Sequence, residues 1–322
     1  MIKYIRFHFK EPFHIGSEVP GGDPFAGLVI HSDTLMGGIL FNWIKLFGDT
    51  SGLEGFLNGN PPFFVSSVFP VLGDNFFLPK PKIISDKEKE PESEKEMQMR
   101  KKYKRVKLVP VDILKLYLEA QKVDKEVIIE QWEKLSASIE NYTEPRVRLG
   151  PQMESSQIFY ITRARTSEEL DYYFFVNIKD ASLTDKLLAS LKLLAENGLG
   201  GFRSKGNGRF ELKTEKILED VPETVKQLSS IETNGTFMLI SLLSPSTDSF
   251  QKEKSCFELI IRGGGWALNA KTGSQGLKKR VKMLIEGTIL AEKDPGKNPD
   301  VTPSEWKEKI FQYGMGFYVP LI

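Results

Sequence analysis

The chain from position 198 to position 210 reads Gly198-Leu199-Gly200-Gly201-Phe202-Arg203-Ser204-Lys205-Gly206-Asn207-Gly208-Arg209-Phe210. Glycine permits positive φ and lets another group approach the backbone closely, while arginine and lysine supply the charge that binds a phosphate backbone. A leucine-rich helical pattern over 182–197 precedes this stretch, and Gly198 stands where a helix C′ glycine belongs. We therefore predict a glycine loop, residues 198–209, that joins a helix to a strand beginning at Phe210 and wraps a polyanion.

Direct counting excludes the two common mononucleotide motifs from this loop. The pattern G-x-x-x-x-G-K-[ST], started at Gly201, has its second glycine at Gly206 but Asn207 in the lysine position. The pattern G-x-G-x-x-G fails because Gly208 is followed by Arg209, Phe210 and Glu211. Since a strand rather than a helix follows the loop, its phosphate contacts are expected from backbone amides and cations.

The composition is that of a globular chain of 322 residues, 40% hydrophobic and 27% charged, which is long enough for two domains. The net charge is only +1, so a nucleic-acid site has to rest on local clusters such as the glycine loop or residues 100–107. The single Cys256, and an N-terminus without the apolar core of a signal peptide, favour the cytoplasm. His8, His14 and His31 lack metal-ligand spacing, so we expect neither metal nor cofactor.

The first half of the chain begins with a strand, since residues 1–10 alternate between apolar and polar side chains. A loop over 12–25 carries His14, Gly16 and Ser17. A helix follows, capped by Ser32 or Asp33 and ended by Gly48, and its free N-terminal amides favour phosphate. Gly37 and Gly38 each cost about 1 kcal/mol of helix propensity, which predicts tight packing at that turn. Capping is the simpler role for Ser32 and Thr34, and a structural role is the simpler one for His31.

The middle of the chain alternates between apolar and charged segments. Residues 63–78 predict a hairpin with Gly73-Asp74-Asn75 as its turn. Residues 85–107 are almost entirely charged and predict an exposed, mobile insertion. Helical patterns cover 112–121 and 124–139, and residues 143–166 predict a long hairpin in which Arg146 and Arg148 alternate with apolar residues. Such a hairpin fits a nucleic-acid backbone or, equally, an edge hairpin kept soluble by charge.

The remaining segments complete an α+β fold. Strands at 170–178 and 210–212 flank the helix over 182–197, so residues 1–216 follow an elaborated βαββαβ order. Residues 217–322 start with a helix or linker over 219–230. They continue with strands at 235–243 and 256–262, the run Gly263-Gly264-Gly265-Trp266, a helix over 277–286 and a closing strand at 318–322. We predict two α+β domains in tandem, 1–216 and 217–322.

Three motifs resemble the RAMP superfamily of CRISPR RNA-binding proteins: Phe13-His14-Ile15-Gly16, the segment Ile30-His31-Ser32-Asp33-Thr34-Leu35-Met36-Gly37-Gly38-Ile39, and the glycine loop. The chain resembles in particular the subunit of the type III-A (Csm) effector that caps the 5′ end of the guide RNA. Gly314-Met315-Gly316 and Val319-Pro320-Leu321 fit the ending of that subunit. The specific motifs cover about a tenth of the chain.

The resemblance implies two tandem ferredoxin-like (RRM-like) domains that hold the 5′ repeat-derived tag of the crRNA between them. It implies contact with the large polymerase-like Csm subunit and the adjacent backbone Csm subunit, target RNA nearby, no catalysis, and a hairpin thumb at 146–160. The expected RNA-binding residues are His14, Gly16, Ser17, His31, Ser32, Thr34, Arg146, Arg148, Gly200, Gly201, Phe202, Arg203, Ser204, Lys205, Gly206, Asn207, Gly208, Arg209, Arg262, Gly264 and Trp266.

Two other functions fit parts of the sequence. A metal-independent, repeat-cleaving endoribonuclease of the same superfamily would use His31 or His14 as general base and Lys205 to stabilise the transition state. Such enzymes usually carry the glycine loop near the C-terminus, whereas more than a hundred residues follow it here. A pure protein scaffold would use the glycines as packing devices, and it leaves Arg203, Lys205 and Arg209 without a role.

Overall fold

The fold is taken from a computed structural model of the chain. It describes residues 2–15, 27–48, 50–82, 93–118, 123–149, 156–213, 218–220, 223, 235–246, 255–263, 265–268 and 273–321. Residues 16–25 of the predicted loop over 12–25, and most of the predicted helix or linker over 219–230, lie outside these residues. The first two residues of the latter, Glu219–Asp220, form a strand instead.

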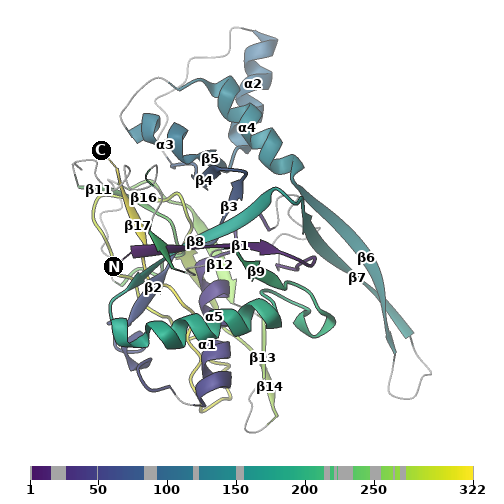
Figure 1. The fold of residues 1–322 in the computed structure, drawn as a ribbon, viewed down its shortest axis with the longest axis vertical. Helices are drawn as coiled ribbons and strands as arrows, with labels where there is room; N and C mark the ends of the chain where they lie inside the picture. Colours follow the sequence, from purple (N-terminus) through teal and green to yellow (C-terminus); the bar gives the residue numbers. More distant parts are fainter. Residues whose placement is uncertain are drawn as a thin grey trace.

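One antiparallel sheet organises the molecule (Figure 1). Its main path runs β10 (Glu219–Asp220), β1 (Ile2–Phe9), β8 (Leu170–Ile178), β3 (Phe69–Leu72), β4 (Asn75–Pro79) and β5 (Leu108–Pro110). β9 (Phe210–Leu212) also pairs with β1, and β2 (Phe63–Val65) with β8. The predicted alternation in β1 is confirmed, because Ile5, Phe7 and Phe9 are buried. The predicted hairpin turn is also confirmed, with Gly73 at φ 60°.

Two helices cover one face of this sheet. α1 (Ser32–Phe47) follows β1, and α5 (Thr184–Asn197) follows β8 and a short 3-10 turn at Ala181–Leu183. They lie across each other in Figure 1 and pack directly. Their buried stripes, Leu35, Ile39 and Trp43 on α1 and Leu187, Leu191 and Leu194 on α5, join the main core. The elements β1, α1, β2, β8, α5 and β9 thus confirm the predicted βαββαβ order.

Three helices form a separate lobe beside β4 and β5: α2 (Glu94–Arg105), α3 (Val111–Leu118) and α4 (Lys125–Ala137) (Figure 1). The prediction of an exposed insertion at 85–107 is confirmed for α2, which has no buried residue, but the prediction of mobility was wrong there because residues 94–105 form a capped helix. Ser93 caps α2 by accepting a hydrogen bond from Glu96 N, and acidic residues in the first turn with basic ones in the last suit the helix dipole. Met99 and Tyr103 pack partly buried against the core. Residues 83–92 lie outside the described part.

The predicted long hairpin is confirmed and projects away from the body (Figure 1). Its strands, β6 (Ile139–Leu149) and β7 (Ser156–Thr166), pair from Ile139↔Thr166 to Leu149↔Ser156. It starts four residues before the predicted 143, since Ile139 is already paired.

The C-terminal part consists of small antiparallel sheets. β11 (Thr236–Leu239) lies between β16 (Ile289–Leu290) and β17 (Tyr318–Leu321), β12 (Leu259–Gly263) pairs with β15 (Arg280–Leu284), and β13 (Trp266–Leu268) pairs with β14 (Gln275–Leu277). Residues Met238, Ile240 and Phe317 from this part belong to the same core as β1 and α1. Among the described residues, no α-helix follows α5.

The predicted helix over 277–286 was wrong. Leu277, Val281 and Leu284 have helical spacing, but short apolar runs fit a strand equally well. Residues 280–284 instead pair along their whole length with β12, from Gly263↔Arg280 to Leu259↔Leu284. Arg280 and Lys282 therefore lie on β15, and Lys278 and Lys279 lie in the connection between β14 and β15.

Candidate nucleic-acid interface

The glycine loop is tied to residues 10–14 by backbone hydrogen bonds. Gly201 N donates to His14 O at 2.7 Å, Gly208 N donates to Pro12 O at 3.0 Å, and Lys10 N donates to Arg209 O at 2.9 Å. Leu199 N also donates to Gly208 O at 2.9 Å, which closes the loop on itself. Two motifs that are about 190 residues apart in the sequence therefore form one ordered unit.

Close backbone contact explains three of the loop glycines. Gly198, Gly200 and Gly208 have positive φ values of 84°, 98° and 73°. A Cβ atom on them would lie 2.3 Å from Asn207 O, 2.4 Å from His14 O and 2.1 Å from Leu199 O, respectively. The expectation that the loop amides face a polyanion was wrong for Leu199, Gly201 and Gly208, whose amides donate within the chain. Lys205 N and Gly206 N likewise donate to Phe202 O and Arg203 O, at 2.9 Å each.

The side chains at the tip of the loop point outward. Phe202 has φ 54°, the one positive value for a non-glycine residue in the described part, and it is 39% exposed. The His14 ring packs edge-on against it, with 5.2 Å between ring centroids. Arg203 lies over the Phe41 ring at 5.0 Å, and Lys205 and Arg209 are exposed. Backbone strain of this kind persists where the surroundings impose it and is common at functional sites.

The start of α1 is occupied by protein groups. Ser32 N donates to Ser67 Oγ at 2.9 Å, and the Thr34 and Leu35 amides donate to His31 O. The prediction that Ser32 or Asp33 caps the helix was wrong, because His31 holds the N-cap position without a side-chain cap bond. Ser32 Oγ instead accepts from Leu242 N at 3.0 Å. The predicted phosphate site on free amides was therefore also wrong at Ser32 and Thr34.

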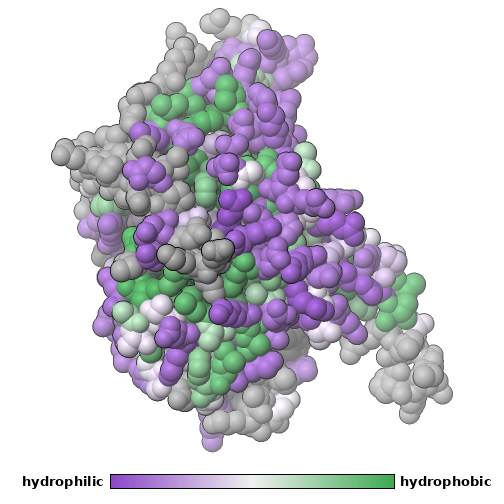
Figure 2. All heavy atoms as spheres, in the orientation of Figure 1, coloured by the Kyte–Doolittle hydropathy of each residue, from purple (hydrophilic) through white to green (hydrophobic). Residues whose placement is uncertain are grey.

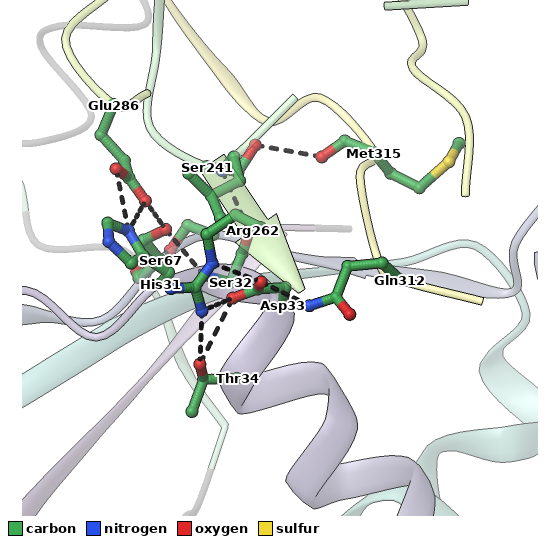
Figure 3. Close-up of polar contacts among 12 residues, drawn as sticks. His31, Ser32, Asp33, Thr34, Ser67, Ser241, Arg262, Glu286, Gln312 and Met315 are labelled. Carbon is green, nitrogen blue, oxygen red and sulfur yellow. Dashed lines mark hydrogen bonds and ion pairs between the residues drawn. The ribbon is translucent and has the colours of Figure 1, made fainter. Parts of the chain in front are cut away.

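Asp33 joins α1 to the C-terminal part (Figure 3). Its side chain is fully buried, and Arg262 of β12 donates to both carboxylate oxygens, from Nε at 2.8 Å and from an Nη at 2.9 Å. Gln312 Nε2 donates to the same carboxylate at 2.6 Å. Burial opposes ionisation of Asp33, but the Arg262 charge and these hydrogen bonds outweigh it and hold the pKa of Asp33 below its usual range.

A second pair, of a partly buried histidine and a buried glutamate, lies beside the first (Figure 3). Glu286 accepts hydrogen bonds from Ser67 Oγ and from His31 Nδ1, the latter at 2.9 Å. Burial opposes charge on both groups, yet their mutual attraction raises the pKa of His31 and lowers that of Glu286. This pair also connects the start of α1 to the C-terminal part.

The His31–Glu286 pair predicts a stability maximum at mildly acidic pH. The pKa of His31 is raised in the folded state, so its contribution is present below the unfolded value of about 6.5 and is lost as the pH rises through the folded pKa. The pKa of Glu286 is lowered, so its contribution is lost as the pH falls below about 4.3. Urea unfolding at a series of pH values from about 5 to 9 should show that the free energy of unfolding of wild type falls as the pH rises, and that His31→Gln lacks this fall. Equal pH profiles for the two proteins would contradict the pairing.

These elements enclose a cleft of about 700 Å³. The cleft is lined by the glycine loop, the first turns of α1, the C-terminal end of β12 and residues 310–313. Among the lining residues are His14, Thr34, Gly37, Phe41, Gly200, Gly201, Arg203, Arg262, Lys278, Phe311 and Gln312. Arg203 from the glycine loop and Lys278 from the C-terminal part both place positive charge in the lining, while the charge of Arg262 is neutralised by Asp33. A concave surface with aromatic and cationic walls suits a single strand of nucleic acid.

The structure brings together part of the predicted site. His14, Thr34, Gly200, Gly201, Arg203 and Arg262 line the cleft, whereas His31, Ser32, Phe202, Ser204, Lys205, Gly206, Asn207, Gly208, Arg209 and Arg146 are not in its lining. Gly16, Ser17, Gly264 and the side chains of Arg148 and Trp266 lie outside the described part. Sequence reasoning missed Phe41, Lys278, Phe311 and Gln312, of which only Lys278, in a cationic run, carried any signal.

The two helical glycines of α1 differ in their surroundings. A Cβ on Gly38 would lie 3.0 Å from Leu194 Cδ1, so the predicted tight packing, here against α5, is confirmed. Nothing lies within 4 Å of a Cβ on Gly37, so the same prediction was wrong there. Gly37 instead lines the cleft.

The described side chains near the end of the projecting hairpin include a paired arginine and several exposed apolar groups. Arg146 pairs with Glu144 at 2.7 Å. Val147, Ile158 and Tyr160 are 57%, 66% and 71% exposed, and the apolar surface of the hairpin shows at the lower right in Figure 2. Val147 lies directly opposite Ile158, so the two share one face.

Two classes of feature are missing from the described residues. They contain no group of three or more His, Cys, Asp or Glu side chains placed to hold a metal ion. Within the same part of the chain, no helix is long and apolar enough to cross a bilayer.

Comparison with protein families gives two adjoining matches. The model of the RAMP superfamily matches residues 6–211, and that of the CRISPR Csm4 C-terminal domain matches residues 232–321. A Csm4 protein of Methanocaldococcus jannaschii is 25% identical, over 85% of this chain and 82% of its own length. A Csm4 protein of Thermococcus onnurineus is 23% identical, over 93% of each chain.

Solved structures share the fold along the whole chain. A chain from a Csm3–Csm4 subcomplex of the type III-A CRISPR–Cas interference complex superposes with a TM-score of 0.65 at 21% identity, covering 100% of this chain and 99% of the other. A chain from a Csm1–Csm4 cassette in complex with pppApA superposes with a TM-score of 0.60 at 18% identity, covering 100% and 98%.

Proposed function

The chain belongs to the RAMP superfamily, and from this premise we propose that it is the Csm4 subunit of a type III-A CRISPR effector. In this role it binds the 5′ repeat-derived tag of the crRNA without cleaving it and docks the large polymerase-like subunit and the adjacent backbone subunit. The complex acts in antiviral defence in the cytoplasm, and the subunit needs no cofactor.

The cleft of about 700 Å³ is the observation that carries the proposal. The three motifs that resemble the superfamily meet there: His14 from the first, Thr34 and Gly37 from the second, and Arg203 from the glycine loop. A single-stranded tag offers phosphates for Arg203 and Lys278 and unstacked bases for aromatic rings. A pure scaffold has no use for cations in the lining of an open cleft.

The partners and the two-domain arrangement are proposed by analogy. The similar structures named above contain Csm3 or Csm1 beside Csm4. The family matches break between residues 211 and 232, which supports a division near residue 216. A ferredoxin-like fold for the second half rests on the analogy alone, since its described residues contain no α-helix. The tag would then lie between the halves, as the cleft does between α1 and the C-terminal strands. The β6–β7 hairpin, with its exposed Val147, Ile158 and Tyr160, would act as the thumb beside the guide–target duplex.

RNA binding by the full chain tests the proposal. Combining Arg203→Glu with Lys278→Glu should weaken binding of a repeat-derived tag RNA at least about tenfold. The slope of log K against log salt concentration should also become shallower, by about 0.7 for each phosphate that is no longer neutralised. The charge-matched control, Lys101→Glu with Lys104→Glu, changes two exposed lysines of α2, which do not line the cleft. Fluorescence anisotropy measures both. Equal binding by the cleft variant and the control would remove the cleft from the site.

The absence of catalysis is tested separately. His31 does not line the cleft, and its Nδ1 is engaged by Glu286, while His14 Nδ1 lies 2.6 Å from Thr162 O. Both arrangements favour structural roles. We therefore expect no cleavage of repeat RNA in the absence of metal. Cleavage that disappears in His31→Ala or His14→Ala would replace the proposal with the endoribonuclease.

A further inference from the structure

The cleft contains a glutamine whose orientation is determined by a buried carboxylate. Gln312 donates from Nε2 to Asp33 Oδ2 at 2.6 Å. An ionised carboxylate only accepts hydrogen bonds, so the nitrogen of the amide has to face Asp33 and the oxygen has to face away. Figure 3 shows this arrangement, with the oxygen on the far side of the amide from Asp33.

Asp33 stays ionised because Arg262 holds it. The guanidinium contacts both carboxylate oxygens, and one of its Nη atoms also donates to Thr34 Oγ1 at 3.1 Å. The Asp33 carboxylate is fully buried, so solvent does not compete for it. The amide of Gln312 is thereby fixed by a chain of contacts that starts on α1 and includes β12.

Gln312 Oε1 is left as an acceptor at the edge of the cleft. Gln312 lines the cleft and is half-buried. Among the described residues, no hydrogen bond is present to this oxygen. A half-buried acceptor in a concave surface favours a ligand that donates a hydrogen bond, because an unmade bond there lowers affinity.

The neighbouring residue supplies a stacking surface. Phe311 is 41% exposed and lines the same cleft. Within the described part of the chain no aromatic ring or cation packs on it, whereas the Arg203 guanidinium lies 5.0 Å from the centre of the Phe41 ring. An open aromatic ring beside a fixed polar group is the combination with which proteins hold an unstacked base and read its edge.

Resting on the proposed function, we propose that Phe311 and Gln312 form a base-reading subsite for RNA in this cleft. A base that carries an exocyclic amino group stacks on the Phe311 ring and donates that amino group to Gln312 Oε1. Arg203 and Lys278, on the walls of the cleft, bind the flanking phosphates. Asp33 and Arg262 are positioning residues, since they orient the amide without touching the RNA.

The test separates stacking from edge reading. The probes are oligo(U) RNAs of about eight nucleotides in which one adenosine, or one purine riboside that lacks the amino group, is placed at each position in turn. With the full wild-type chain, adenosine at one position should bind about fivefold more tightly than purine riboside, the value of one hydrogen bond. Fluorescence anisotropy gives the dissociation constants.

The variants give distinct expected results. Gln312→Met keeps the length of the side chain and should abolish the preference for adenosine over purine riboside. Phe311→Ala should weaken binding of all these RNAs about tenfold, since stacking tolerates any base. Gln131→Met, on α4 and away from the lining, is the matched control. Thermal unfolding confirms that each variant folds.

Two outcomes overturn the subsite in different ways. If Gln312→Met keeps the adenosine preference, or wild type shows none at any position, the subsite is wrong while tag binding by the cleft stands. If wild type binds none of these RNAs nor the repeat-derived tag, the proposed function fails and the subsite fails with it.

Discussion

Replacing Asp33 by Asn should lower the free energy of unfolding by about 3 kcal/mol or more, because it leaves the Arg262 guanidinium, whose side chain is only 13% exposed, without its counter-charge. Two hydrogen bonds from Arg262 and one from Gln312 converge on this carboxylate. Since Asp33 is on α1 and Arg262 is on β12, the variant should also loosen the packing of the sheet body against the C-terminal strands. Urea unfolding at neutral pH measures the change.

An exposed ion pair provides the control for Asp33→Asn. Lys102 of α2 and Glu133 of α4 lie 2.9 Å apart, with side chains 60% and 57% exposed. Such pairs contribute about 0–1 kcal/mol, so Glu133→Gln should leave the unfolding midpoint nearly unchanged. A similar loss of stability in the two variants would mean that burial of the Asp33–Arg262 pair has no special effect.

Gly208→Ala should destabilise the glycine loop by more than about 2 kcal/mol. A left-handed conformation costs a residue with a Cβ roughly 1–2 kcal/mol, and this Cβ would lie 2.1 Å from Leu199 O, which is backbone and cannot move aside cheaply. The shift would break the hydrogen bonds from Leu199 N to Gly208 O and from Gly208 N to Pro12 O. The midpoint of thermal unfolding and the affinity for RNA should therefore both fall.

Gly73→Ala separates the two causes. Gly73 has φ 60° at the β3–β4 turn, and nothing lies within 4 Å of its Cβ position. Gly73→Ala should lower the free energy of unfolding only by the cost of the left-handed conformation, roughly 1–2 kcal/mol, and should not affect RNA binding. If Gly208→Ala is no worse than Gly73→Ala, close backbone approach is not what requires glycine in the loop.

The glycine loop is compatible with two interpretations of its sequence, packing and binding of an anion. The glycines at 198, 200 and 208 serve packing, as a scaffold would use them. The same packing places Arg203 on the cleft wall, where the resemblance to RNA-binding proteins expects positive charge. Glycine makes the loop compact and the cations suit it to an anionic ligand, so residue type alone did not distinguish the two roles.

Local pattern was enough for elements whose contacts are mostly local or strongly periodic. Strands β1 and β8, helices α1 and α5, and the pairing of β6 with β7 were all predicted, because alternation and helical spacing reflect one buried face. The pattern failed at 277–286, where a short apolar run among lysines fits either structure, and at Glu94–Arg105, where a charged helix is stabilised by its cap and by α4.

The sequence by itself determined the βαββαβ order of the first 212 residues, the place of the glycine loop between helix and strand, and the resemblance to RAMP proteins. Only the tertiary structure decided which residues line the cleft. Asp33 reads as a helix cap and Gln312 as an ordinary polar residue, yet they lie 279 positions apart and share a 2.6 Å hydrogen bond. Contacts at such separation depend on how the strands pack over α1, which local residue preferences do not encode.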